Sequence, residues 1–207
     1  MHAVFDWLPI AALIADVALT LHGGIGDGKW GLGQLANSVP RPLLTLRDAP
    51  IMVAQALWSD PSDSDEVMAF GVHHAKERDP NDNYTQVGHS LAYLVTPRTA
   101  PCPETAPRTA PSTQAHPRWL ASSPQVMKRF GPDVTETFCA REGVQLIIRS
   151  HQYVEEGVKF MHGGRLVTVF SARNYLRAAK NDGALLLLAT DGHGHVRVRA
   201  KRLLHNK

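Results

Sequence analysis

The chain has 207 residues, 43% of them hydrophobic and 20% charged, with a formal net charge of +3 at pH 7. This length predicts one domain with a sizeable core, and no apolar run is long enough to span a bilayer, so no membrane partner is expected. Much of the positive charge lies in scattered arginines and in the basic end RVRAKRLLHNK, which a solvated surface explains as well as nucleic-acid binding does; we predict no nucleic-acid partner.

Residues 1–61 alternate short apolar runs with turn signals. The runs LPIAALIA and VALTL flank Asp16, a pattern that predicts two strands joined by a tight connection. The glycine-rich stretch HGGIGDGKWG follows and is expected to be a loop. In LRDAPIMVAQALW the apolar residues recur near helical spacing, which predicts a helix with Asp48 as its N-cap before Pro50.

Residues 62–124 have a different composition and are predicted to be a surface insertion. The pentapeptide PRTAP occurs twice, at 97–101 and 107–111. Proline at this density removes backbone donors and blocks helices, so we expect an extended or disordered segment. The apolar piece LAYLV at 91–95 is expected to pack against the domain. A docking segment for a proline-recognising partner is the alternative.

Residues 125–207 regain the signals of regular structure. FGPDVTETFCAREG predicts a helix with Val134, Phe138 and Cys139 on one face and Gly143 as its end. The apolar runs LIIR, LVTVFSA and ALLLLAT predict strands, the first of them a buried strand of a parallel sheet. The alternating RVRAKRL is expected to form an edge strand. Together these elements predict an α/β or α+β fold.

Two histidines share one setting, because each follows a predicted buried strand at the point where a loop begins. His22 follows VALTL and opens HGG, while His151 lies just beyond LIIR and opens HQYV. Layered α/β folds gather ligands at such strand ends, and imidazole is the commonest nitrogen ligand of transition metals. Taken alone, each histidine is explained better as a structural residue. The other histidines at 73, 74, 193 and 195 are expected on the surface, where the GHGH turn could bind metal adventitiously.

Seven short motifs then occur in one order: LPIAALI, LHGGIG, LWSDP, FGPD, IIRSHQYVEEG, LVTVFSARNY and GALLLL. This series resembles the C-terminal half of the catalytic domain of the PPP family of serine/threonine protein phosphatases. The resemblance covers residues 1–61 and about 128–200, which would form a half-domain interrupted by the insertion. HGGIG and FGPD further resemble the kelch-repeat branch of the family, although this sequence contains no kelch repeats.

The resemblance implies a calcineurin-like metallophosphoesterase fold, a β-sandwich flanked by helices, with its C-terminal half present here. It implies hydrolysis of phosphoserine and phosphothreonine by two divalent metal ions, for which Mn, Fe and Zn suit the ligand types. His22 and His151 match two ligands of one metal. Tyr175 and Asp60 match residues at the substrate cleft, with Asp60 expected to support loop structure. Arg149 is expected to anchor its strand end near the cleft, with a structural salt bridge as the equal alternative.

The family's motifs GDxHG, GDxVDRG and GNHE, which supply the other metal ligands, a phosphate-binding arginine and the general acid, do not occur in this sequence. A second phosphate-binding arginine is replaced by Pro124 or Gln125, and neither Arg118 nor Arg129 has its spacing. We therefore expect at most one partial metal site and a chain that is inactive alone, as a piece of a phosphatase acting on phosphoproteins, with a regulatory subunit as a further partner. The alternatives are a non-catalytic, pseudophosphatase-like binding or regulatory module, and an unrelated α/β domain.

The two cysteines, Cys102 and Cys139, are too few for a disulfide framework. The apolar N-terminal stretch contains Asp6 and Asp16 and lacks a basic region, so it does not resemble a secretory signal. These features predict an intracellular protein of the cytoplasm or nucleus.

Overall fold

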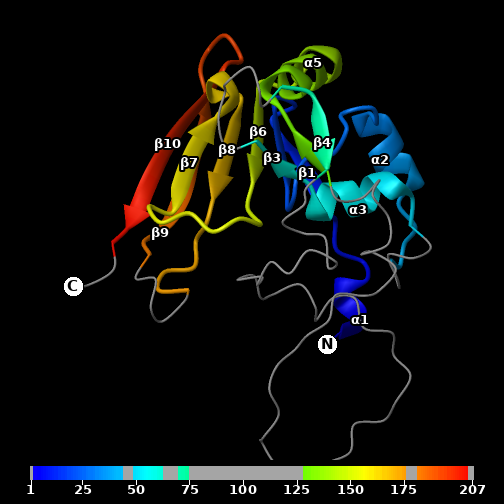
Figure 1. The fold of residues 1–207 in the computed structure, drawn as a ribbon, viewed down its shortest axis with the longest axis horizontal. Coiled ribbons are helices and arrows are strands. Elements are labelled where there is room, and N and C mark those ends of the chain that lie inside the picture. The colour runs from blue at the N-terminus through cyan, green and yellow to red at the C-terminus, as the bar shows by residue number, and fades with distance from the viewer. Residues whose placement is uncertain (1, 44–48, 63–69, 75–127, 176–180, 205–207) are drawn as a thin grey trace, which may run out of the picture.

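The computed structural model describes five stretches of the chain, residues 2–43, 49–62, 70–74, 128–175 and 181–204 (Figure 1). Several predicted features lie outside them: Asp48, the LAYLV segment, both PRTAP repeats, Cys102, Arg118, Pro124 and Gln125. Within these stretches, no helix combines the length and the apolar character needed to cross a membrane.

A five-stranded sheet in the order β1-β2-β6-β8-β7 forms the centre of the fold. Its strands are β1 (Ala11–Ile14), β2 (Ala18–Leu21), β6 (Leu146–Arg149), β7 (Val158–Met161) and β8 (Leu166–Val169). The first two form an antiparallel hairpin whose turn places Ala15 and Asp16 at positive φ, which confirms the predicted tight connection. Strand β6 runs parallel to both of its neighbours and is buried along its whole length, as its apolar run predicts.

Successive side chains of β6 enter two different cores, because strand side chains alternate between the faces of a sheet. Ile147 belongs to the larger core, which packs the sheet against helices. Leu146 and Ile148 belong to the smaller core on the opposite face. This division fixes the layer order of the molecule: helices, five-stranded sheet, second sheet.

The second sheet is an antiparallel hairpin of β9 (Gly183–Thr190) and β10 (Val196–Leu203). It closes the smaller core with a set of half-buried side chains: Leu186, Leu188, Val196 and Val198. Strand β10 is the predicted edge strand and lies at the left margin of Figure 1. The two sheets packed face to face form the expected β-sandwich.

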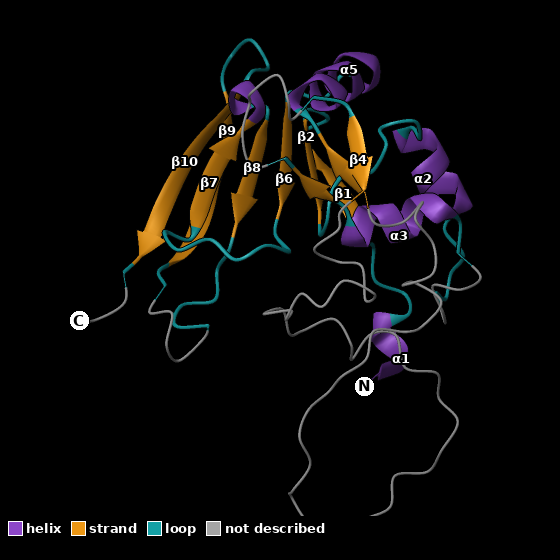
Figure 2. Ribbon diagram, viewed as in Figure 1, coloured by secondary structure: helices purple, strands orange, loops and turns teal. Residues whose placement is uncertain are grey.

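Three helices pack on the other side of the five-stranded sheet (Figure 2): α2 (Leu32–Ser38), α3 (Ile51–Trp58) and α5 (Pro132–Glu142). The short α1 (His2–Phe5) lies below the sheet in this view, and the 3₁₀ helix η5 (His162–Gly164) directly follows β7. Helix α5 follows its prediction, with Pro132 in the first turn and Gly143 ending it at φ 70°. Helix α3 corrects the expected cap, because Pro50 and not Asp48 occupies the N-cap position.

A small third sheet was not predicted and joins β3 (Asp60–Pro61), β5 (Lys128–Phe130) and β4 (Val72–His74) in that order. Strands of two or three residues are too short to show a hydrophobic period. Strand β4 lies inside the range predicted as an insertion, so this part of the range contributes to a sheet. Asp60, one of the residues singled out in the sequence, lies on this sheet.

Candidate metal centre

The two singled-out histidines meet at the carboxyl ends of neighbouring parallel strands. His22 directly follows β2, and His151 follows β6 after one intervening residue. The Ser150 amide donates to the His22 carbonyl at 3.1 Å, which ties the two strand exits together. His22 Nε2 lies 2.9 Å from His151 Nδ1, although 129 residues separate them in the sequence. The ring centroids are 4.7 Å apart at 69°.

This approach fits two imidazole ligands of one metal ion. Metal–nitrogen bonds of about 2.0–2.1 Å allow two nitrogens to lie at most about 4 Å apart, and 2.9 Å lies well inside that limit. Both side chains are half-buried, so an ion could reach them. Among the described residues, no group of three or more His, Cys, Asp or Glu is arranged to hold a metal. The pair provides two candidate metal ligands at this position.

Close packing against helix α3 fixes the loop that carries His22. The Gly23 amide donates to the Ala56 carbonyl at 2.7 Å. A Cβ on Gly23 would lie 2.5 Å from the carbonyl carbon of Leu57, a distance that real Cβ atoms do not adopt. A Cβ on Gly24 would lie 2.4 Å from the Phe130 ring. The two glycines after His22 are thus required by the approach of the helix and of the FG motif.

The backbone of His151 adopts φ 64°, in the left-handed region that non-glycine residues seldom occupy. Such a conformation costs on the order of 1–3 kcal/mol and persists only where its surroundings impose it. Trp58 supplies one such constraint, since its ring packs edge-on against the His151 ring with centroids 5.4 Å apart. Trp58 is itself buried. Sequence reasoning missed this residue, and its only signal was its place immediately before the SDP motif.

Arg149 connects the three motifs of the site. Its Nε donates to the Gly23 carbonyl at 2.6 Å, and its Nη1 donates to Gln152 Oε1 at 2.9 Å. Its Nη2 lies 2.8 Å from Asp60 Oδ1. The guanidinium therefore holds the HGG loop, the SHQ loop and the SDP strand in one arrangement, using the fork geometry that distinguishes arginine from lysine.

Both members of the Arg149–Asp60 ion pair have fully buried side chains. Neither side chain offers surface to a substrate, so the pair matches the structural salt bridge that the sequence left open for Arg149. Asp60 is linked to the two histidine loops through Arg149, and its expected role in supporting loop structure stays a prediction. Each charge of this buried ion pair is stabilised by the other, because burying one charge without the other would be energetically costly.

Tyr175 lies on the loop after β8 and is half-buried. Its amide donates to Asn181 Oδ1 at 2.9 Å, and its ring packs edge-on against Phe170 at 5.0 Å. Phe170 in turn packs against Tyr153, two residues beyond His151. These contacts link the predicted cleft residue to the SHQ loop through aromatic side chains.

A second HGG tripeptide, at 162–164, has a different use. His162 is buried, with Nδ1 2.7 Å from Thr135 Oγ1 and Nε2 3.2 Å from Ser62 Oγ. It bridges helix α5 and Ser62, the residue that follows β3. Sequence reasoning did not single it out.

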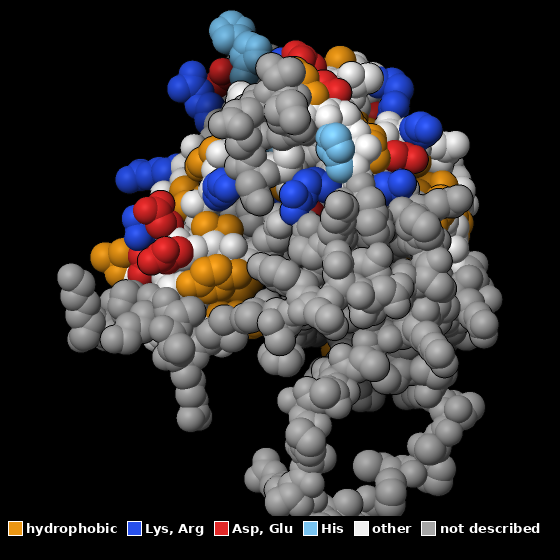
Figure 3. All heavy atoms as spheres, in the orientation of Figure 1, with side chains coloured by type: hydrophobic (Ala, Val, Ile, Leu, Met, Phe, Trp, Pro, Cys, Tyr) orange, Lys and Arg blue, Asp and Glu red, His pale blue; other side chains and the backbone are white. Residues whose placement is uncertain are grey.

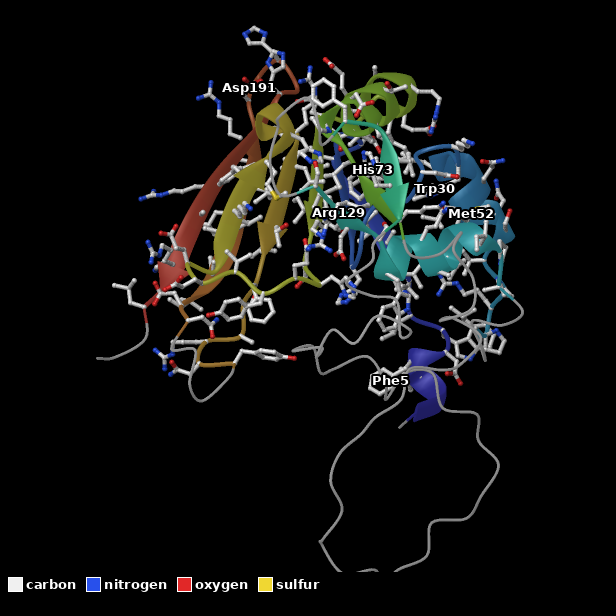
Figure 4. All side chains as sticks on the ribbon, in the orientation of Figure 1. Phe5, Trp30, Met52, His73, Arg129 and Asp191 are labelled. Carbon is white, nitrogen blue, oxygen red and sulfur yellow. The ribbon has the colours of Figure 1, made fainter. Side chains whose placement is uncertain are left out.

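Arg129, the nearest substitute for the missing phosphate-binding arginine, lies on β5 (Figure 4). In the sheet register it is opposite Asp60 on one side and His73 on the other. Phe130, the next residue, is fully buried in the larger core, so the side chain of Arg129 points to the opposite face of this small sheet. His73 is exposed, as expected, and His193 and His195 are exposed at the β9–β10 turn.

No family model matches the chain. The chain is 30% identical over 191 residues to serine/threonine-protein phosphatase BSL2 of Arabidopsis thaliana, an alignment that covers 92% of this chain and 14% of that protein. It is 49% identical over 57 residues to serine/threonine-protein phosphatase T of Trypanosoma brucei brucei, and 48% over 58 residues to the phosphatase T of Aspergillus oryzae. Each of these two shorter alignments covers 28% of this chain and 12% of the relative.

Among solved structures, a serine/threonine phosphatase from Saccharomyces cerevisiae, described as similar to human phosphatase PP5, matches with a TM-score of 0.59. The match covers 98% of this chain and 49% of the yeast chain, at 23% identity. At this identity the match shows a shared fold. The chain thus spans about half of the solved phosphatase and a smaller share of the curated relatives.

Proposed function

We propose that this chain, which belongs to the PPP family of serine/threonine protein phosphatases, supplies two ligands of a divalent metal site for the hydrolysis of phosphoserine and phosphothreonine. The observation that supports this proposal most directly is the distance of 2.9 Å between His22 Nε2 and His151 Nδ1 at the ends of parallel strands. In this proposal residues 1–61 and 125–207 form the phosphatase half-domain, and residues 62–124 are the insertion.

The metal that His22 and His151 would hold is Mn, Fe or Zn, which all accept imidazole. When bound, such an ion lowers the pKa of a coordinated water and polarises phosphate oxygens. The protein's own contribution is positional. Arg149 locks the two histidine loops through the Gly23 carbonyl and Gln152, and Trp58 covers one side of the His151 ring.

The isolated chain should have activity near background. Its sequence lacks the family's general-acid motif and both phosphate-binding arginine motifs. Each such group is worth on the order of 10²-fold or more in rate, so their joint absence removes most of the acceleration. A phosphoprotein substrate and a regulatory subunit are the partners that the family assignment supports.

Metal binding is tested by tryptophan fluorescence, because Trp58 packs directly on His151. Titration of the full chain with Co²⁺ should quench emission, and Trp58→Phe should remove most of the quenching while equilibrium dialysis still records binding. His22→Ala and His151→Ala should abolish that binding. His193→Ala with His195→Ala is the matched control, since it removes two exposed imidazoles of the GHGH turn. Equal quenching in the wild type and His151→Ala would contradict the site.

Catalysis is tested separately with Mn²⁺ and p-nitrophenyl phosphate or a phosphoserine peptide. We expect no turnover above buffer. Turnover that disappears in His151→Ala would show a complete active site and refute the predicted inactivity. Metal binding without turnover is the expected result, and the alternative, a non-catalytic binding or regulatory module that keeps half of a metal site, shares it.

A further inference from the structure

The outward face of the β9–β10 hairpin carries two parallel columns of side chains. Antiparallel register places each residue of one strand directly opposite a residue of the other, and opposed residues share a face. On the face turned away from the five-stranded sheet the end pair is Gly183 with Leu203, and the three opposed pairs that follow it are Leu185 with Lys201, Leu187 with Arg199, and Ala189 with Arg197. We call the six residues of these three pairs the outer ribbon.

The six residues of the outer ribbon are exposed, whereas the alternate residues are buried or half-buried except Thr190 and Arg202. Leu187 is 53% and Leu185 37% exposed, while Leu186 and Leu188 pack into the smaller core. On the other strand Arg197, Arg199 and Lys201 are all exposed. Figure 3 shows Lys and Arg side chains projecting along the left edge of the molecule, where Figure 1 places β10.

The exposed leucines of β9 lie in one column and the cations of β10 lie in the next, and this separation indicates a ligand. Charged residues on an edge strand commonly prevent pairing with strands of other molecules. This role explains the cations of β10, but it does not explain exposed leucines on the same face. Two exposed leucines in one column are apolar surface that layered folds normally bury under a third layer. The cations occupy the neighbouring column, so a covering element must be apolar on one side and acidic beside it.

The dimensions of the ribbon match one helix. Two strands about 4.8 Å apart give a strip roughly 10 Å wide, and an α-helix with its side chains is about 10–12 Å across. Five residues of strand span roughly 14–17 Å, which corresponds to about ten helical residues. Among the described residues, the ion pair made by the outer ribbon lies at one end: Asp191, at the hairpin turn in Figure 4, is 3.6 Å from Arg197.

We propose that the outer ribbon binds an acidic amphipathic helix of a partner protein. The partner's apolar stripe covers Leu185 and Leu187, and its acidic flank faces Arg199 and Lys201. This inference is independent of the metal site and holds whether or not the chain is catalytic.

The probe is a fluorescein-labelled peptide of about 18 residues, long enough to cover the ribbon as a helix. It carries leucine at i, i+3, i+4 and i+7 spacing, glutamate flanking that stripe and alanine elsewhere, and is titrated by anisotropy with the full chain. Arg199→Glu should weaken binding at least about tenfold, since it places like charges in contact. Leu187→Gln should weaken it about fivefold or more, because apolar burial is lost. Lys29→Glu is the matched control: it makes the same charge change at an exposed loop position, and should alter affinity less than about twofold.

A charge swap decides between specific docking and general attraction. A peptide with lysine in place of glutamate should bind Arg199→Glu more tightly than the wild type. The proposal is overturned if no peptide binds, if Lys29→Glu weakens binding as much as Arg199→Glu, or if polyglutamate without leucines binds equally well. Binding to phosphatidylserine vesicles in place of the peptide would also overturn it, in favour of a membrane surface. Circular dichroism confirms that each variant is folded.

Discussion

The buried Arg149–Asp60 pair gives the sharpest test of how the site is built. The perturbation is Arg149→Met, which keeps most of the length of the side chain and removes the guanidinium. It leaves the Asp60 carboxylate fully buried without the Arg149 cation, and takes the donor from the Gly23 carbonyl. Removing one partner of a buried pair costs about 3–5 kcal/mol, and an unsatisfied buried carbonyl about 1–3 kcal/mol more.

We therefore expect Arg149→Met to lower the free energy of unfolding by at least about 4 kcal/mol, a large share of the roughly 5–15 kcal/mol typical of folded domains. Thermal unfolding should shift down by roughly 10–15 °C. Arg165→Met is the matched control, because Arg165 pairs with Glu136 at 3.3 Å with both side chains about half exposed. Its cost should be below about 1 kcal/mol.

Urea unfolding followed by circular dichroism measures both variants under the same conditions. The double variant Arg149→Met, Asp60→Asn should recover part of the loss, because it replaces a buried carboxylate that has lost the Arg149 cation with a neutral amide. The reasoning fails if Arg149→Met costs no more than Arg165→Met, or if adding Asp60→Asn to the Arg149→Met variant recovers nothing. Either result would mean that the pair does not hold the loops together.

Two further predictions concern titrating groups away from the site. Burial raises the pKa of the Cys139 thiol to about 11, so at about pH 8 iodoacetamide should label it about two orders of magnitude more slowly than a free thiol. Peptide mapping distinguishes labelled Cys139 from labelled Cys102. Fast labelling of Cys139 without denaturant would contradict its burial. Burial raises the pKa of Glu142, but hydrogen bonds from Arg141 and from the Leu32 amide outweigh it and hold the pKa below its ordinary 4.5. The resulting stability is present above pH 4.5 and lost as the pH falls through the lowered value, so the deficit of Glu142→Gln in urea unfolding should be larger at about pH 7 than at about pH 3. A deficit that is the same at both pH values would refute this.

Local signals were enough to predict the elements that frame the site. The hairpin around Asp16, strand β6 and helix α5 with its end at Gly143 all follow from short-range patterns and are confirmed. Each depends on interactions within a few residues, such as a β-branched apolar run or a glycine that accepts positive φ. Strands β3 and β4 escaped prediction because their two or three residues are held only by pairing with distant segments.

Residue types were sufficient to predict His22 and His151, at strand ends, as candidate metal ligands. The order of the motifs was sufficient to indicate the family. How these side chains are held follows from the packing of the whole chain. Parallel pairing of β2 with β6 aligns the strand ends and brings two imidazole nitrogens to 2.9 Å across 129 residues. The same packing makes Arg149 and Asp60, both expected near the cleft, a fully buried pair. No local pattern encodes these facts, because register and burial depend on how whole layers pack.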